Sequence, residues 1–128
     1  SFPGNLFVSL LLDPAGDIAE AGQLGFVTSL ALRDALLPVL PEGTLIECKW
    51  PNDVLINGRK AAGILLESFT PPGDPRLWVI VGVGVNIDAH PPETLFPATC
   101  LKEEGVELIS AKIVLSRFIH HFVLRYNE

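Results

Sequence analysis

The chain has 128 residues, of which 48% are hydrophobic and 19% charged, and its net charge is −6. This composition excludes an intrinsically disordered chain and indicates one globular domain. The negative charge argues against nucleic acid as a partner, because a nucleic-acid-binding surface needs a basic stripe. No apolar run reaches the ~18 residues that span a bilayer, so we expect no membrane partner.

Two residue types bear on the origin of the chain. Cys48 and Cys100 lie far apart without metal-ligand spacing, which predicts two reduced, buried thiols in a cytoplasmic protein. The chain contains no methionine, even at position 1. We therefore expect it to be a fragment or a processed product.

The first elements in chain order are a strand and a long helix. Residues 5–12 are almost continuously apolar, which predicts a strand buried on both faces. Asp17 and Glu20 have the spacing of a capping box, which predicts a helix of about twenty residues ending near Pro38. A stripe at helical spacing predicts that this helix packs in the core; it consists of Leu24, Val27, Thr28, Ala31, Ala35 and Leu36.

A hairpin follows a predicted strand at residues 44–49. Pro51 fixes φ and donates no N–H, so we expect the chain to bend there. Two short apolar runs, residues 54–56 and 61–66, flank Asn57-Gly58. This dipeptide predicts a type I′ turn, in which both central residues have positive φ.

Residues 77–87 predict a strand whose two faces differ. Strict alternation places Val79, Val81, Val83, Val85 and Ile87 on one face. The opposite face carries Ile80, Gly82, Gly84 and Asn86. Two glycines on one face indicate close approach of another group, either a ligand or a packed helix or aromatic ring.

The rest of the chain predicts one more helix. Residues 90–100 are a proline-rich connection with one helical turn at 93–96. Ser110 is the predicted N-cap of an amphipathic helix, whose apolar stripe is Leu115, Phe118, Ile119, Phe122 and Tyr126. His120 and His121 are interpreted as surface residues, because adjacent helical residues point about 100° apart and cannot chelate one ion.

Three motifs in a fixed order carry a family resemblance: K-W-P-N-D at 49–53, R-K-A-A-G-I-L at 59–65 and G-V-G-V-N at 82–86. They resemble the catalytic domain of biotin–protein ligases, relatives of the lipoate ligases, over most of the chain. With the predicted elements, the resemblance implies an α+β fold, a mixed, largely antiparallel sheet with helices packed on one face. It also implies that residues 1–128 are a partial catalytic domain, without the basic loop and the SH3-like C-terminal domain of the family. We therefore expect the isolated fragment to be weakly active or inactive.

The resemblance assigns roles to individual residues. Lys60 matches the lysine that contacts both the biotin carboxylate and the α-phosphate of ATP, and is the expected catalytic residue. Asn52, Asp53 and Asn86 match residues near the phosphates and Mg²⁺. Gly82, Val83 and Gly84 would form the floor of the adenine pocket. Gly63 and Ile64 would offer backbone groups to the biotin tail.

Each assignment has a structural alternative. Lys60 taken alone is a solvated charge at a sheet edge. Asn52 and Asp53 are equally a cap on the turn at Pro51. Trp50 would wall the biotin pocket or lie in the core.

The implied function is ATP-dependent activation of biotin to biotinoyl-5′-AMP, followed by transfer to a lysine of a biotin carboxyl carrier protein. A homodimer through a sheet edge is a further expectation, whereas no helix-turn-helix segment supports a repressor role. Two alternatives stay open. One is a lipoate- or octanoate-type protein ligase, and the other is a non-catalytic ligand-binding remnant of the same fold.

Overall fold

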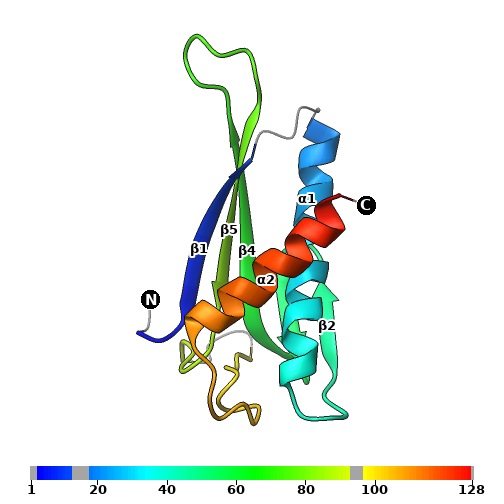
Figure 1. Cartoon of the computed structure of the whole chain (residues 1–128), viewed down its shortest axis with the longest axis vertical. Helices are drawn as coiled ribbons and strands as arrows, with labels where there is room; N and C mark the ends of the chain where they lie inside the picture. Colours follow the sequence, from blue (N-terminus) through cyan, green and yellow to red (C-terminus); the bar gives the residue numbers. More distant parts are fainter. Residues whose placement is uncertain (1–2, 13–17, 93–96, 128) are drawn as a thin grey trace.

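The structure is a computed structural model that describes residues 3–12, 18–92 and 97–127. Five strands form one sheet in the order β1-β5-β4-β3-β2, and all four pairings between neighbours are antiparallel (Figure 1). Their bounds are β1 Leu6–Leu12, β2 Ile46–Lys49, β3 Asp53–Ile56, β4 Arg59–Phe69 and β5 Trp78–Val85. The helices α1 (Ile18–Leu36) and α2 (Ala111–Tyr126) cover one face of this sheet, which confirms the predicted α+β class.

The hydrophobic core lies between the helices and the covered face of the sheet. The predicted alternation along β5 is confirmed, because Val79, Val81, Val83 and Val85 are all buried. The predicted core stripe of α1 is confirmed as well, with Val27 half-buried and the other five residues buried. Thr28 satisfies its buried hydroxyl by donating to the Leu24 carbonyl oxygen at 2.6 Å.

Helix α2 begins where the sequence predicts. The Ser110 Oγ accepts from the Ile113 N–H at 3.2 Å and so caps the helix. Buried Val114, Phe118 and Phe122 form the centre of its apolar stripe, so the predicted stripe is displaced toward Val114. The Tyr126 side chain, at the end of that stripe, is exposed.

The two helices cross in front of the sheet (Figure 1). The Arg125 Nε donates to the Asp34 carboxylate and the Arg117 Nε donates to the Ala35 carbonyl oxygen, both at 2.8 Å. Within the described residues no helix is long and apolar enough to cross a membrane.

Strand β1 corrects one prediction. Its side chains alternate between the core and solvent, so it is not buried on both faces. Phe7 is 57% exposed and Leu11 is 59% exposed. Both helices lie on the opposite side of the sheet, and nothing in the apolar run itself distinguishes its two faces.

The hairpin forms at Asn57-Gly58, whose φ angles of 52° and 79° confirm the predicted left-handed turn. Beyond the turn the β3–β4 register shifts, because Leu55 pairs with Lys60 while Val54 pairs with Ala62. Ala61 is therefore an extra residue in β4, a β-bulge. Both Ala61 and Ala62 are buried, which a regular strand with alternating faces does not allow.

Other predictions meet the structure only in part. The turn at residues 13–17 with the Asp17 cap, and the helical turn at 93–96, lie outside the described residues. Both cysteines are free, but only Cys100 is buried and Cys48 is half-buried, with burial raising the pKa of the Cys48 thiol. His120 is exposed and His121 half-buried, and no cluster of metal-ligating side chains occurs in the described ranges.

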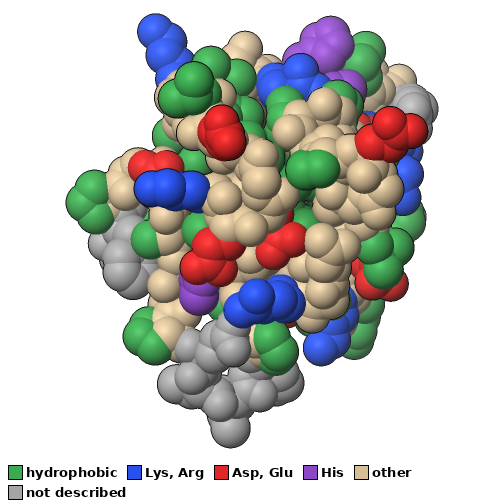
Figure 2. Space-filling model, turned by 90° about the horizontal axis from the view of Figure 1, so that it is seen from below, with side chains coloured by type: hydrophobic (Ala, Val, Ile, Leu, Met, Phe, Trp, Pro, Cys, Tyr) green, Lys and Arg blue, Asp and Glu red, His purple; other side chains and the backbone are tan. Residues whose placement is uncertain are grey.

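The end of the molecule opposite the long β4–β5 loop carries charges of both signs. Figure 2 views the molecule from this end and shows acidic and basic side chains interspersed rather than gathered in separate patches.

Candidate functional site

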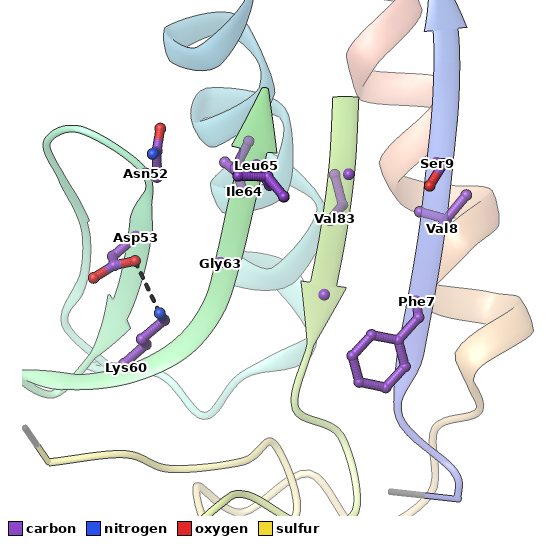
Figure 3. Close-up of a pocket in the computed structure, with 12 residues that line it drawn as sticks. Phe7, Val8, Ser9, Asn52, Asp53, Lys60, Gly63, Ile64, Leu65 and Val83 are labelled. Atoms are coloured by element: carbon purple, nitrogen blue, oxygen red, sulfur yellow. Dashed lines mark ion pairs between the residues drawn. The ribbon is translucent and has the colours of Figure 1, made fainter. Parts of the chain in front are cut away.

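A pocket of about 590 Å³ lies on the open face of the sheet, the face that the helices leave uncovered. Its base, which we call the glycine floor, consists of Gly63 on β4 and Gly82 and Gly84 on β5. Asn52, Asp53 and Lys60 lie together at one side and form what we call the polar corner (Figure 3). Strand β1 provides the opposite wall.

The β-bulge explains why Lys60 reaches this pocket. If β4 ran without a bulge, so that residues 60–63 alternated regularly, Lys60 would lie on the face opposite Gly63, which is the core face. With the bulge, Lys60 and Gly63 share the open face, and a Cβ at Gly63 would lie 3.3 Å from the Lys60 Cε and Nζ. Bulges near functional sites often redirect a side chain in this way.

Lys60 pairs with Asp53 across the hairpin. The Lys60 Nζ lies 3.2 Å from the Asp53 Oδ1, and the two side chains are 46% and 33% exposed (Figure 3). Water screens such a partly exposed pair, so the pair contributes little to stability. The arrangement presents a cation and an anion to whatever enters the pocket.

The glycine floor supports both interpretations made from the sequence. A Cβ at Gly84 would lie 3.3 Å from the Phe7 ring, so packing of an aromatic ring accounts for this glycine. A Cβ at Gly82 would meet nothing closer than 3.6 Å, an ordinary contact with the Leu65 carbonyl oxygen. Packing in the free protein does not require a glycine at 82, and the space above it is open to a ligand.

Ile64 and Val83 line the pocket only through their backbone. Both side chains are buried on the core face. The Ile64 N–H donates to the Asn52 carbonyl oxygen at 2.9 Å. That N–H is therefore engaged within the protein.

Asn86 lies beside the main pocket rather than in it. It lines an adjoining pocket of about 260 Å³ that shares Phe7, Lys60, Gly63 and Gly84 with the first. Its Nδ2 donates to the Thr99 carbonyl oxygen at 3.2 Å. The predicted site residues of β3, β4 and β5 are thus brought together, with Asn86 at the end near Lys60.

Trp50 does not join this group. Its side chain is 87% exposed, so it is not a core residue. It lines a second, mainly apolar pocket of about 330 Å³ between α1 and residues 48–52, together with Phe26, which is 63% exposed. This second pocket shares Asn52 with the main pocket. The prediction that Trp50 walls the same pocket as Lys60 has no support in this geometry.

The wall formed by β1 was not identified as part of the site from the sequence. Phe7, Val8 and Ser9 line the pocket, and Phe7 projects toward β5 (Figure 3). Because side chains alternate along a strand, residues 6–12 could have been predicted to place Phe7 and Ser9 on the same face. No sequence signal specifies which face of β1 is open.

The polar corner fits a metal ion that arrives with its own ligands. The described part of the chain holds no group of three or more histidine, cysteine or acidic side chains that could enclose an ion. Asp53 supplies one carboxylate at this corner, and Asn52 lines the same pocket with its side chain directed away from Asp53 (Figure 3). Mg²⁺ is commonly bound through one or two carboxylates plus substrate phosphates, and the corner matches that pattern.

An antiparallel sheet with helices on one face and a lysine-containing, glycine-floored pocket on the other has the form of an α+β ligand-binding domain. The chain belongs to the biotin/lipoate A/B protein ligase family, whose model matches residues 4–128.

Individual relatives agree with this assignment. The chain is 48% identical over 89 residues to a biotin–[acetyl-CoA-carboxylase] ligase of Paracoccus denitrificans, covering 69% of this chain and 36% of that protein. It is 32% identical over 127 residues to the bifunctional ligase/repressor BirA of Bacillus spizizenii, covering 96% and 38%. A solved biotin protein ligase from Aquifex aeolicus, in complex with biotin and ATP, superposes with a TM-score of 0.75 at 28% identity, covering 97% and 50%. The chain therefore spans between about a third and a half of the length of these relatives.

Proposed function

We propose that the chain carries the adenylation site of a biotin–protein ligase. Biotin and ATP would occupy the open face of the sheet, and the product would be biotinoyl-5′-AMP. The observation that carries the proposal is the placement of Lys60, which a β-bulge directs over the glycine floor and beside Asp53. The proposal also draws on the family and on the Aquifex aeolicus relative, whose description includes biotin and ATP.

The reaction explains why a lysine is needed there. A biotin carboxylate oxygen attacks the α-phosphorus of ATP, the new P–O bond forms, and the bond to pyrophosphate breaks. Both reactants are anions, and negative charge develops on the α-phosphate in the transition state. A fixed ammonium group between them offsets the repulsion and stabilises that charge.

The neighbouring residues have complementary roles in this proposal. The open space above Gly82 lets a flat or extended ligand approach the backbone of β5. The Asp53 carboxylate pairs with Lys60 before the substrates bind, and with Asn52 it is the proposed contact for Mg²⁺ carried by ATP. Asn86 would contact the nucleotide from the adjoining pocket.

The second half of the reaction needs a partner. We infer that the amine of a lysine on a biotin carboxyl carrier protein attacks the carbonyl carbon of the adenylate, forms an amide and releases AMP. A mixed anhydride is readily hydrolysed, so the site must exclude water while the adenylate waits. The described pocket is open on one side of the sheet, and we therefore expect the isolated chain to release or hydrolyse the adenylate.

Calorimetric titration tests the proposal directly. A stable analogue of biotinoyl-AMP is titrated into the chain and into Lys60→Ala, with Lys112→Ala as the matched control. Lys112 is an exposed lysine on α2, which packs on the other face of the sheet. We expect the analogue to bind the wild-type and control chains, and to bind Lys60→Ala more weakly. Equal affinity for all three chains would contradict the assignment of Lys60.

The same titration separates the biotin and lipoate interpretations. Lipoyl-AMP, or a stable analogue of it, is titrated in parallel with the biotinoyl analogue. Preference for the biotinoyl compound supports the proposal, and preference for the lipoyl compound assigns the chain to the lipoate branch of the family. Binding of neither compound would indicate a scaffold without a working site.

A further inference from the structure

The position of Lys60 depends on its backbone. Its side chain is 46% exposed, and its ion pair with Asp53 is also exposed to solvent. Such a pair does not by itself fix a long, flexible side chain. The bulge at Ala61 also interrupts the regular β3–β4 ladder beside Lys60. Other contacts must therefore hold this part of β4.

Residues 97–99 provide these contacts. The Lys60 N–H donates to the Pro97 carbonyl oxygen at 3.0 Å, and the Thr99 N–H donates to the Lys60 carbonyl oxygen at 2.9 Å. The segment thus forms a short parallel β-bridge with Lys60, in which Ala98 is the residue paired with Lys60. In the sequence it follows the end of β5 at Val85. Both backbone groups of Lys60 are held by this one segment.

Glu104 ties the segment to the hairpin turn. The Thr99 hydroxyl, in a buried residue, donates to the Glu104 Oε2 at 2.6 Å. The Asn57 Nδ2 donates to the Glu104 Oε1 at 2.9 Å. A single carboxylate thus links the turn that precedes Lys60 with the residue that holds the Lys60 carbonyl group, and we call this contact the carboxylate bridge.

Both ends of the carboxylate bridge are fixed. The Asn57 N–H donates to the Leu45 carbonyl oxygen at 2.7 Å, and the Asn57 Oδ1 accepts from the Leu45 N–H at 3.1 Å. The Glu104 N–H donates to the carbonyl oxygens of Cys100 and Leu101, each at 3.1 Å. Hydrogen bonds to an ionised carboxylate are stronger than those between neutral groups, so the bridge is well suited to hold two loops in register.

We propose that Glu104 is a positioning residue that holds Lys60 over the glycine floor. Glu104 acts through the backbone of Lys60, because neither it nor Thr99 lines the pocket. The inference rests on the proposed function only in the role given to Lys60. The bridge itself is a property of the free protein and can be measured without any ligand.

The experiment compares four chains: wild type, Glu104→Ala, Glu104→Gln and Glu107→Ala. Glu104→Ala removes both hydrogen bonds. Glu104→Gln keeps the shape and can still accept from Asn57 and donate to the Thr99 hydroxyl oxygen. Glu107, an exposed acidic residue three positions away, is the matched control.

Three quantities are measured on each chain. Amide hydrogen exchange of Lys60 and Thr99 reports on the backbone hydrogen bonds between Lys60 and residues 97–99. The ¹³Cε and ¹⁵Nζ signals of the Lys60 side chain report on its placement beside Asp53. Titration of the biotinoyl-AMP analogue reports on the site. For Glu104→Ala we expect both amides to exchange faster, the Lys60 side-chain signals to shift, and affinity to fall on the order of tenfold, as for a misplaced catalytic group. Glu104→Gln should restore most of each quantity, and Glu107→Ala should match the wild type.

Two results would overturn the proposal. Unchanged exchange and unchanged Lys60 signals in Glu104→Ala would mean that the bridge does not hold this segment. Faster exchange with unchanged Lys60 signals would mean that Glu104 has a structural role only. If the wild-type chain does not bind the analogue, the proposed function fails, but exchange and the Lys60 signals still decide whether Glu104 positions Lys60.

A second variant covers the case in which Glu104→Ala does not fold. Asn57→Gly removes the hydrogen bond to Glu104 and also the one from the Leu45 N–H, and it retains a residue suited to the φ of 52° at this position. We expect the same changes at Lys60 and Thr99, but smaller. Folded Asn57→Gly protein without these changes would contradict the proposal.

Discussion

The two faces of the sheet are built from the same strands but carry different kinds of side chain. On the covered face, β5 presents Val79, Val81, Val83 and Val85 to the helices, and all four are buried. On the open face the same strand presents Gly82 and Gly84, and β4 presents Gly63. In the part of β5 that borders the pocket, valines lie on the covered face and glycines on the open face.

The difference between the two faces assigns stability to one side of a strand and ligand binding to its other side. Burial of β-branched side chains against helices stabilises the fold, whereas bare backbone beside Lys60 and Asp53 leaves room for a ligand. Substitutions on the covered face should therefore change the free energy of unfolding, and substitutions on the open face should change binding. The following predictions test this separation.

Substitution of Lys60 should give the largest functional effect. Lys60→Met keeps the length of the side chain and removes its charge, so we expect adenylate formation by an active form of the protein to fall roughly 10²–10³-fold, as for loss of a preorganised charge. The free energy of unfolding should change by less than ~0.5 kcal/mol, because the ion pair is exposed. Pyrophosphate exchange and urea denaturation measure the two quantities. A large loss of stability with unchanged turnover would mean that Lys60 has a structural role and not a catalytic one.

On the covered face, Val81→Ala should act in the opposite way. Val81 has no exposed surface, and its truncation leaves a cavity beneath the helices. We expect a loss of about 2 kcal/mol in the free energy of unfolding, measured by urea denaturation. Affinity for the biotinoyl-AMP analogue should stay close to that of the wild type, because the Val81 side chain lies on the face opposite the pocket. A substantial loss of affinity would show that the two faces are coupled.

The glycine floor should give a smaller effect on binding alone. A Cβ at position 82 makes only ordinary contacts in the free protein, so Gly82→Ala should fold at least as stably as the wild type. The added methyl group enters the pocket, and we expect the affinity for the analogue to fall on the order of tenfold. Calorimetry and thermal unfolding check these two quantities. Unchanged affinity would mean that the ligand does not approach the floor at this glycine.

The pH dependence of stability should give the smallest effect, at a site away from both faces. Hydrogen bonds to the Pro91 carbonyl oxygen and the Glu103 carboxylate raise the pKa of His90. A raised pKa in the folded state means that protonated His90 stabilises the fold below the unfolded value of ~6.5. This contribution disappears as the pH rises through the folded pKa.

His90→Gln tests this prediction. The melting temperature of the wild type relative to His90→Gln should be higher at pH 5.5 than at pH 8. In the Glu103→Gln chain, the melting temperature relative to His90→Gln should depend less on pH, because the substitution removes the charge that His90 faces. An identical pH dependence in all three chains would contradict the role of the His90–Glu103 pair.

Sequence patterns predicted those features that depend on local chemistry. Asn57-Gly58 specifies its own turn through positive φ. The alternation of valine and glycine in β5 specifies both faces of that strand, and Ser110 specifies the start of α2. The α+β class follows from the order of these elements.

Features that depend on how the elements pair and pack could not be predicted. The bulge at Ala61 arises from the pairing of β3 with β4 and is not marked by glycine or proline. The open face of β1 depends on where the helices pack. The contact between Asn57 and Glu104 joins residues 47 positions apart in the sequence.

The central claim is that the open face around Lys60, rather than the pocket beside Trp50, binds the ligand. Amide chemical-shift mapping with the biotinoyl-AMP analogue tests it most directly, because it reports on every strand at once. We predict the largest shifts at Lys60, Gly63, Gly82 and Gly84, with little change at Gly22, Phe26 and Trp50. Shifts concentrated at Gly22, Phe26 and Trp50, which line the second, mainly apolar pocket, would contradict the account.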